Sequence, residues 1–174
     1  MYQKFLSIFA DGSESTLEKG GELFRTGESV RMVHLVVDGR VDLIRHTASG
    51  NRLVLFRAIN GNIPAEASAY SKNYHCDGVA ADDSKLLSIP KSDFLAKLEQ
   101  DAELAGVWAK SLAHALQAAR MNSEIRTLRK VEERLDAWLA VHNSLPPKGQ
   151  WQDLAQTLGI SREALYRELA RRRS

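Results

Sequence analysis

Apolar and polar residues alternate with a period of two in the first half of the chain, which is the pattern of half-buried β-strands. The alternation runs over residues 33–37 and resumes over residues 41–43. Asp38-Gly39 stands between these runs, and such a dipeptide is typical of a tight hairpin turn because glycine accepts positive φ. We therefore predict two short strands joined by a hairpin.

More strand-like runs follow, separated by turn residues at intervals of about ten residues. The runs cover residues 53–56, 78–81 and 85–89, and the turns are Ser49-Gly50-Asn51, Asn60-Gly61-Asn62 and Asp82-Asp83. We expect residues 78–81 to pair with residues 85–89 across Asp82-Asp83. This spacing predicts a small antiparallel sandwich or barrel. Residues 62–76 fit neither a strand nor a long helix, and we expect a ligand to bind there.

After Pro90 the period changes to that of a helix, and one long helix is predicted from Asp101 to about Lys130. One apolar stripe suits packing against the β-domain and contains Trp108, Leu112, Leu116 and Ala119. A second stripe has the 3-4 spacing of heptads and contains Leu104, Val107, Ser111, His114, Ala118, Met121, Ile125 and Leu128. A second face needs a second partner, so we predict a two-stranded coiled coil between subunits. Burial of this face inside one subunit is the alternative.

Residues 151–173, WQDLAQTLGISREALYRELARRR, are interpreted as a helix-turn-helix. The first helix is closed by Gly159, which suits a left-handed C-terminal cap. Ser161 is a good N-cap for the second helix, and Leu165 and Leu169 are its predicted buried pair. Glu168 departs from the motif, since that position is usually apolar. An ordinary helical hairpin with a solvated charged face is the alternative.

In a helix-turn-helix the N-terminal part of the second helix enters the major groove, where Arg bonds guanine and Glu accepts from cytosine N4. We expect Arg162, Glu163 and Arg167 to read bases. The whole set predicted to contact DNA is Ser161, Arg162, Glu163, Tyr166, Arg167, Arg171 and Arg172.

Charge is unevenly distributed along the chain, although its net value is only +2. Residues 120–174 carry 11 Lys and Arg against 7 Asp and Glu, so the basic excess lies with the predicted DNA-binding part. The single cysteine, Cys76, excludes an internal disulfide and a multi-cysteine metal site, which suits a reducing cytoplasm. No apolar run reaches the ~18 residues of a membrane span, and no signal peptide is evident. We expect a cytoplasmic protein without a membrane partner.

Catalysis is not expected, because no Ser-His-Asp order, P-loop, HExxH motif or paired-cysteine site occurs. Glu66, His75 and Asp77 form only a loose polar cluster. His75-Cys76 does not predict haem, since adjacent residues cannot both be axial ligands of one iron. A polar turn with one buried thiol is the expectation there.

The order of these parts resembles the cyclic-AMP receptor protein/fumarate-nitrate regulator (Crp/Fnr) superfamily of bacterial transcription factors. The similarity is carried by GELF at 21–24, VDGRV at 37–41, IPKSDF at 89–94 and ISREALYR at 160–167. It implies an α+β fold with an N-terminal antiparallel β-roll over residues 1–100, a dimerisation helix over 101–130 and a helix-turn-helix domain over 131–174. A homodimer that binds palindromic double-stranded DNA follows from it, with RNA polymerase and a small-molecule effector as candidate partners. The rival is a ligand-sensing or protein-interaction module without sequence-specific DNA binding.

The family's phosphate-binding cassette has Gly-Glu and, further on, Arg-Ser, whereas this chain has Ala65-Glu66 and His75-Cys76. The arginine that would neutralise a cyclic phosphate is missing, so we expect no cyclic AMP binding of the usual kind. Family members also continue into a two-stranded wing; the sequence stops at Ser174, and we expect no wing. The effector pocket implied by the resemblance contains Glu66, Ala67, His75, Cys76 and Arg120.

Overall fold

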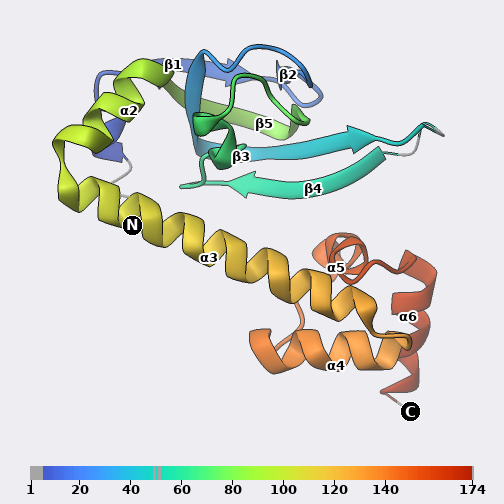
Figure 1. The fold of residues 1–174 in the computed structure, drawn as a ribbon. Helices are drawn as coiled ribbons and strands as arrows, with labels where there is room; N and C mark the ends of the chain where they lie inside the picture. Colours follow the sequence, from blue (N-terminus) through green and yellow to red (C-terminus); the bar gives the residue numbers. More distant parts are fainter. Residues whose placement is uncertain (1–5, 49, 51, 174) are drawn as a thin grey trace. The chain divides into compact units, whose positions relative to one another are not determined.

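The computed structural model describes residues 6–48, 50 and 52–173 (Figure 1). The chain divides into two compact units, the first up to Leu112 and the second from Ala113. The boundary lies inside helix α3 (Ala102–Thr127), so α3 contributes side chains to both units. Within the described ranges, no helix has the length and apolar character needed to cross a membrane.

The first unit is built on an antiparallel sheet. Its strands are β1 (Ser13–Leu17), β2 (Glu22–Phe24), β3 (Met32–His46), β4 (Arg52–Ile59) and β5 (Asp77–Pro90). They are ordered β1-β5-β3-β4, β2 also pairs with β5, and every pair is antiparallel. The sheet and the helices that follow it confirm the predicted α+β class and the antiparallel β-domain.

Strands β3 and β5 are each continuous, so two predicted hairpins are wrong. Asp38-Gly39 lies inside β3, and Asp82-Asp83 lies inside β5. The β3–β5 register shifts repeatedly between Val36 and Val41, which is the mark of bulges. Gly39 has a φ of +81°, and a Cβ there would lie 2.2 Å from the carbonyl oxygen of Asp83. The turn residues therefore bend the paired strands instead of reversing the chain.

Two further predicted turns flank β4. Asn60-Gly61-Asn62 does end this strand, with the Asn62 amide donating to the Ile59 carbonyl oxygen at 2.9 Å. In the turn between β3 and β4, Ser49 and Asn51 lie outside the described residues, and Gly50 has a φ of +81°.

Alternating residues cover both faces of the sheet, as the period of two requires. One face buries Val36, Val41, Ala58 and Leu86. The other face buries Val33, Leu35 and Ile89 beneath α2 (Lys91–Gln100) and the first half of α3. The side chains that cover this second face are Ile8, Phe9, Phe94, Leu98 and Trp108.

The second unit contains the end of α3, α4 (Val131–His142), the short turn η2 (Lys148–Gln150), α5 (Trp151–Leu158) and α6 (Arg162–Arg171). Leu165 and Leu169 are buried, as predicted for the inner face of the second helix of the motif. The core that they join also contains Ile125, Leu135, Trp138, Trp151, Leu154, Ala155 and Leu158.

Candidate nucleic-acid interface and effector cassette

Local chemistry at the turn between α5 and α6 follows the predicted pattern. Gly159 adopts φ 65° and ψ 38°, the left-handed conformation that closes α5. The Ile160 amide donates to the Ala155 carbonyl oxygen at 3.0 Å. Ser161 is the N-cap of α6, and its Oγ accepts from the Ala164 amide at 3.1 Å. The sequence in this turn therefore fixes where one helix stops and the next begins.

Two arginines outside the helix-turn-helix bind the C-terminal end of α5. Arg126, at the end of α3, donates to the carbonyl oxygens of residues 156 and 157 at 3.3 and 3.0 Å. Arg134, on α4, donates to those of residues 158 and 159 at 3.0 and 2.9 Å. The last carbonyls of a helix have no partner within the helix, so these bonds satisfy them and fix the end of α5. Sequence reasoning missed both arginines, because only the fold brings them to this point.

The outer face of α6 presents the residues predicted to read bases. Ser161, Arg162, Glu163 and Arg167 are exposed. In the described part of the chain Arg167 has no hydrogen-bond or ion-pair partner, so its guanidinium group is available to DNA. Hydrogen bonds from its own backbone amide and from the Ser161 hydroxyl lower the pKa of Glu163. Glu163 is therefore a carboxylate at neutral pH, the form that accepts from cytosine N4.

Glu168 explains why a carboxylate occupies a position that is usually apolar. It is 8% exposed, and both its oxygens lie 2.9 Å from guanidinium nitrogens of Arg171. Arg172 Nε donates to the same carboxylate at 2.7 Å. The two arginines also pair with α4, Arg171 with Glu132 at 3.1 Å and Arg172 with Asp136 at 2.7 Å. Glu168 is thus the centre of an ion-pair network that joins the end of α6 to α4.

This network changes the role of two residues that were predicted to contact DNA. The guanidinium groups of Arg171 and Arg172 are held by carboxylates of their own chain, and the Arg172 side chain is 27% exposed. We assign both to helix packing and leave them out of the DNA proposal. Hydrogen bonds from the two arginines lower the pKa of Glu168 from 4.5 to about 2.

The cassette residues lie on the short helix η1 (Glu66–Tyr70) and just before β5. Ala65, which stands where the family has glycine, adopts φ 53° and ψ 46°. The left-handed region costs a residue with a Cβ roughly 1 kcal/mol or more. Glu66 is half-buried, and burial raises the pKa of its carboxyl. Ala67 is exposed, so it is not enclosed in a pocket of the first unit.

Lys91, at the start of α2, donates from Nζ to the Ser71 carbonyl oxygen of the cassette at 2.6 Å. Arg45, at the end of β3, is a second cation that the structure brings there. Its Nη2 donates to the His75 carbonyl oxygen at 2.9 Å. Burial raises the pKa of the Cys76 thiol, and the charge of Arg45 opposes that rise. Cys76 packs with Phe24, Leu43 and other apolar residues, which agrees with the expected buried thiol. Sequence reasoning missed Arg45, because strand pairing alone places it beside the cassette.

The other two residues of the predicted effector pocket are exposed. The His75 ring lies on the surface, with its Nε2 3.3 Å from Ser71 Oγ. Arg120 belongs to the second unit and is exposed on α3. Within the first unit, the charged groups beside the cassette therefore include Glu66, Arg45, Asp77 and Lys91.

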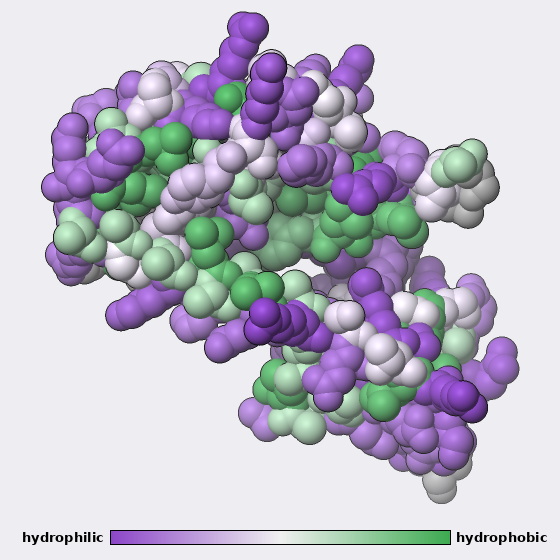
Figure 2. Space-filling view, in the orientation of Figure 1, coloured by the Kyte–Doolittle hydropathy of each residue, from purple (hydrophilic) through white to green (hydrophobic). Residues whose placement is uncertain are grey.

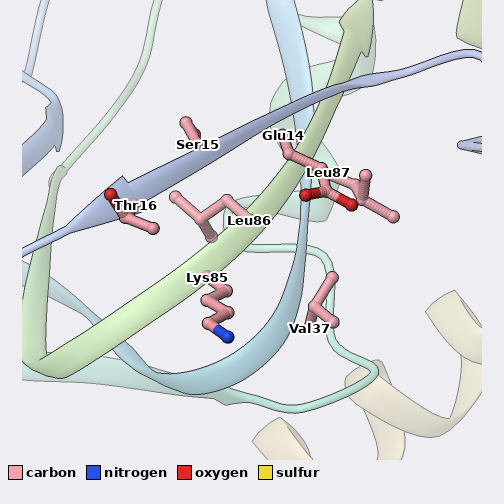
Figure 3. Close-up of a pocket in the computed structure, with 7 residues that line it drawn as sticks. All are labelled: Glu14, Ser15, Thr16, Val37, Lys85, Leu86 and Leu87. Atoms are coloured by element: carbon pink, nitrogen blue, oxygen red, sulfur yellow. The ribbon is translucent and has the colours of Figure 1, made fainter.

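A separate hollow of about 560 Å³ lies on the β1–β5 part of the sheet (Figure 3). Figure 3 shows Glu14 beside Leu87, its register partner across the two strands. The hollow is lined by Glu14, Ser15, Thr16, Val37, Lys85, Leu86 and Leu87. None of the cassette residues belongs to this lining.

The eight residues of the predicted subunit seam have four different environments. Leu104 and Val107 pack against the core of the first unit. Ile125 is 1% exposed inside the core of the second unit, so its assignment to the subunit contact is wrong. Ser111 and Leu128 are half-buried. The other three, His114, Ala118 and Met121, line a hollow of about 520 Å³ together with Trp138 and Val141 of α4.

Comparison with known proteins places these features in a family context. The Cyclic nucleotide-binding domain family matches residues 14–101, more than half of the 174 residues. The cyclic AMP receptor protein of Thermus thermophilus is 26% identical over 156 residues, which are 87% of this chain and 72% of that protein.

Solved structures share the fold over most of the chain. FixK2 from Bradyrhizobium japonicum has a TM-score of 0.74 at 18% identity, over 92% of this chain and 83% of that chain. The c-di-GMP responsive global regulator CLP from Xanthomonas campestris has a TM-score of 0.73 at 19% identity, over 99% of this chain and 92% of that chain. The similarity extends from the β-domain through α6.

Glu168→Gln is expected to destabilise the protein at neutral pH by about 1–3 kcal/mol, because it removes the charge that two arginines hold. The folded pKa of about 2 lies below the ordinary value of 4.5. The charge therefore stabilises the fold fully above about pH 5, and this contribution is lost as the pH falls towards 2. Urea unfolding followed by tryptophan fluorescence at several pH values measures it.

Glu124→Gln is the matched control, since it makes the same change at an exposed position of α3 in the second unit and should leave the stability nearly unchanged. If Glu168→Gln lowered the free energy of unfolding equally at pH 7 and pH 3, the shape of the side chain would matter and its charge would not.

Proposed function

Because the chain belongs to the Crp/Fnr superfamily of cyclic nucleotide-binding domain proteins, we propose that it is a transcription regulator that binds palindromic DNA as a homodimer. The observation that carries this proposal is the exposed face of α6, where Arg162, Glu163 and Arg167 surround the N-terminal turns of a capped helix. A catalytic function is not part of the proposal, and a regulator of this kind acts in the cytoplasm, where the chromosome is.

Each of the three residues has a definite role in the proposed complex. Arg162 and Arg167 donate to guanine O6 and N7, and Glu163 accepts from cytosine N4. Ser161 caps α6, so the N-terminal end of the helix, with its free backbone amides, would face the DNA. A helix N-terminus binds phosphate favourably. Tyr166, which also belongs to the predicted DNA-contacting set, is half-buried and lies behind Arg162.

Dimerisation is proposed through the exposed part of the α3 seam. His114, Ala118 and Met121 lie on one face of α3 and border the hollow with α4, so a second helix can pack there. Exposed apolar side chains elsewhere support a partner as well. Figure 2 shows apolar surface over β4, where Leu53, Leu55, Phe56 and Ile59 are 39–54% exposed. Surface of this kind marks an interaction site more often than it is left bare.

The β-roll is proposed to sense an effector other than cyclic AMP, or to hold the regulator in one state without an effector. Glu66 can accept from a ribose hydroxyl, but a cyclic phosphodiester also needs a fixed pair of donors. Arg45 and Lys91 are charged donors beside the cassette, and each already donates to a backbone carbonyl oxygen, Arg45 to that of His75 and Lys91 to that of Ser71. Redirecting either donor to a phosphate would break its bond to that carbonyl oxygen.

Specific DNA binding tests the proposal directly. Selection from a random duplex pool should enrich an inverted repeat, and Arg167→Ala should weaken binding to it by about 1–3 kcal/mol while random duplex loses much less. Arg129→Ala is the charge-matched control, because Arg129 is exposed outside α6. Equal weakening of selected and random duplex by Arg167→Ala would make Arg167 a phosphate contact. If no sequence is enriched, the alternative function as an interaction module is favoured.

The dimer is tested by light scattering at micromolar concentration. Met121→Glu should shift the protein to monomer, because it buries a charge in the proposed helix contact. Ala119→Glu, which adds the same charge to an exposed position on another face of α3, should leave the dimer intact. A monomeric unsubstituted protein, or a dimer that tolerates Met121→Glu, would contradict the proposed contact.

Calorimetric titration tests the effector proposal. Cyclic AMP should bind with a Kd weaker than roughly 0.1 mM. His75→Arg, which restores a guanidinium at the family's position, should tighten binding by roughly 10–100-fold if that missing charge is the cause. Micromolar affinity in the unsubstituted protein that is lost in Arg45→Ala would show that Arg45 replaces the missing arginine.

A further inference from the structure

A continuous series of cation and ring contacts runs under the N-terminal turn of α6. The Arg162 guanidinium carbon lies 5.2 Å from the centre of the Tyr166 ring. That ring meets Trp151 edge to face, with centroids 5.2 Å apart and planes at 70°. Arg173 lies over the Trp151 ring at 5.6 Å. Arg162, which is predicted to read a base, therefore rests on a side chain that is itself supported.

Trp151 is the rigidly held ring on which this series of contacts rests. It is 6% exposed, belongs to the core of the second unit, and donates from Nε1 to the Pro146 carbonyl oxygen at 3.0 Å. Tyr166 packs against the same core and is half-buried. Its ring can therefore move little, and one face of it is turned towards Arg162.

A free arginine on a helix surface samples many rotamers, and ordering it on DNA costs entropy. Stacking on an aromatic face reduces that cost, because the guanidinium plane is held by the ring quadrupole before DNA arrives. Arg162 and Tyr166 are four residues apart, the spacing at which helix side chains meet. Arg167 has no such support among the residues described, so the two base-reading arginines differ in how far they are ordered in advance.

We propose that Tyr166 is a positioning residue for DNA reading, which holds Arg162 in the orientation that contacts guanine. This inference rests on the proposed function and adds a residue that acts through Arg162 without contacting a base. The Tyr166 hydroxyl has no hydrogen-bond partner within the described part of the chain. The ring face is therefore the part of the side chain that supports Arg162.

A double-mutant cycle on the full chain measures the coupling. Tyr166→Leu keeps an apolar contact with Trp151 and removes the ring face. It should weaken binding to the selected inverted repeat by about 2–5-fold, the range of an exposed cation–π contact, and should relax selectivity at one base pair of each half-site. In the Arg162→Ala background the same change should have no further effect. Tyr166→Phe should restore affinity and selectivity, because it keeps the ring.

Two results of this cycle would contradict the positioning role of Tyr166. A Tyr166→Leu loss of equal size in both backgrounds would make Tyr166 a packing residue only, and a Tyr166→Phe loss as large as that of Tyr166→Leu would make it a direct hydroxyl contact to DNA. Either result overturns the inference while leaving DNA binding established. An unsubstituted chain that selects no duplex would instead overturn the proposed function.

Arg162→Lys provides a second measurement that does not disturb the Tyr166–Trp151 contact. It keeps the positive charge but lacks the planar group that stacks on the ring. Its selectivity should fall and should no longer respond to Tyr166→Leu. If Tyr166→Leu still lowers selectivity by the same factor in the Arg162→Lys background, the ring acts through the fold and the positioning role is wrong.

Discussion

The carbonyl groups at the end of α5 have no partners within their own helix, and the way in which they are satisfied organises the second unit. Arg126 comes from α3 and Arg134 from α4, and the two divide the carbonyl oxygens of residues 156–159 between them. A buried or crowded helix end without such donors would lose several hydrogen bonds at once. Apolar packing holds the helices together, and these directed bonds reinforce the end of α5 that Gly159 sets. Since α6 starts after one turn, with Ser161 as its N-cap, they also help to hold the start of α6 in place.

Helix α3 links this arrangement to the first unit because it takes part in two cores. Trp108 is 3% exposed in the first core, and its Nε1 donates to the hydroxyl of Tyr70 at 2.8 Å. Tyr70 is the last residue of η1, the cassette helix. Ile125 and Arg126 belong to the second unit through burial and through the bonds to α5. A ligand could therefore change the position of α3 only if it bound the cassette more tightly in one arrangement of Tyr70 than in another. Regulation through the cassette requires such a difference in affinity.

Local chemistry made the helix-turn-helix predictable, since Gly159, Ser161 and Leu165 each act on their own neighbours in the chain. The alternation that predicted an antiparallel sheet is equally local. Asp38-Gly39 shows where this reasoning fails, because the same residues suit a hairpin or a bulge, and the paired strand β5 decides between them. Ile125 fails for a related reason: heptad spacing marks a face that needs a partner without saying whether the partner is α4 and α5 or a second subunit. Arg45, Arg126 and Arg134 reach groups that are distant in sequence or set by the fold, so no local pattern identified them.

The ion-pair network also changes what the charge distribution means for DNA. Residues 120–174 hold 11 Lys and Arg against 7 Asp and Glu, which suggests a basic DNA-binding surface. Arg171 and Arg172, however, are neutralised by Glu168, Glu132 and Asp136, and Arg126 and Arg134 are committed to backbone carbonyls. Four of the eleven cations are thus committed within the chain, and the affinity that counterion release provides scales with the number of phosphates contacted. In the proposed complex, fewer phosphate contacts per subunit than the net charge suggests would make a second subunit, which doubles the phosphate and base contacts, important for affinity.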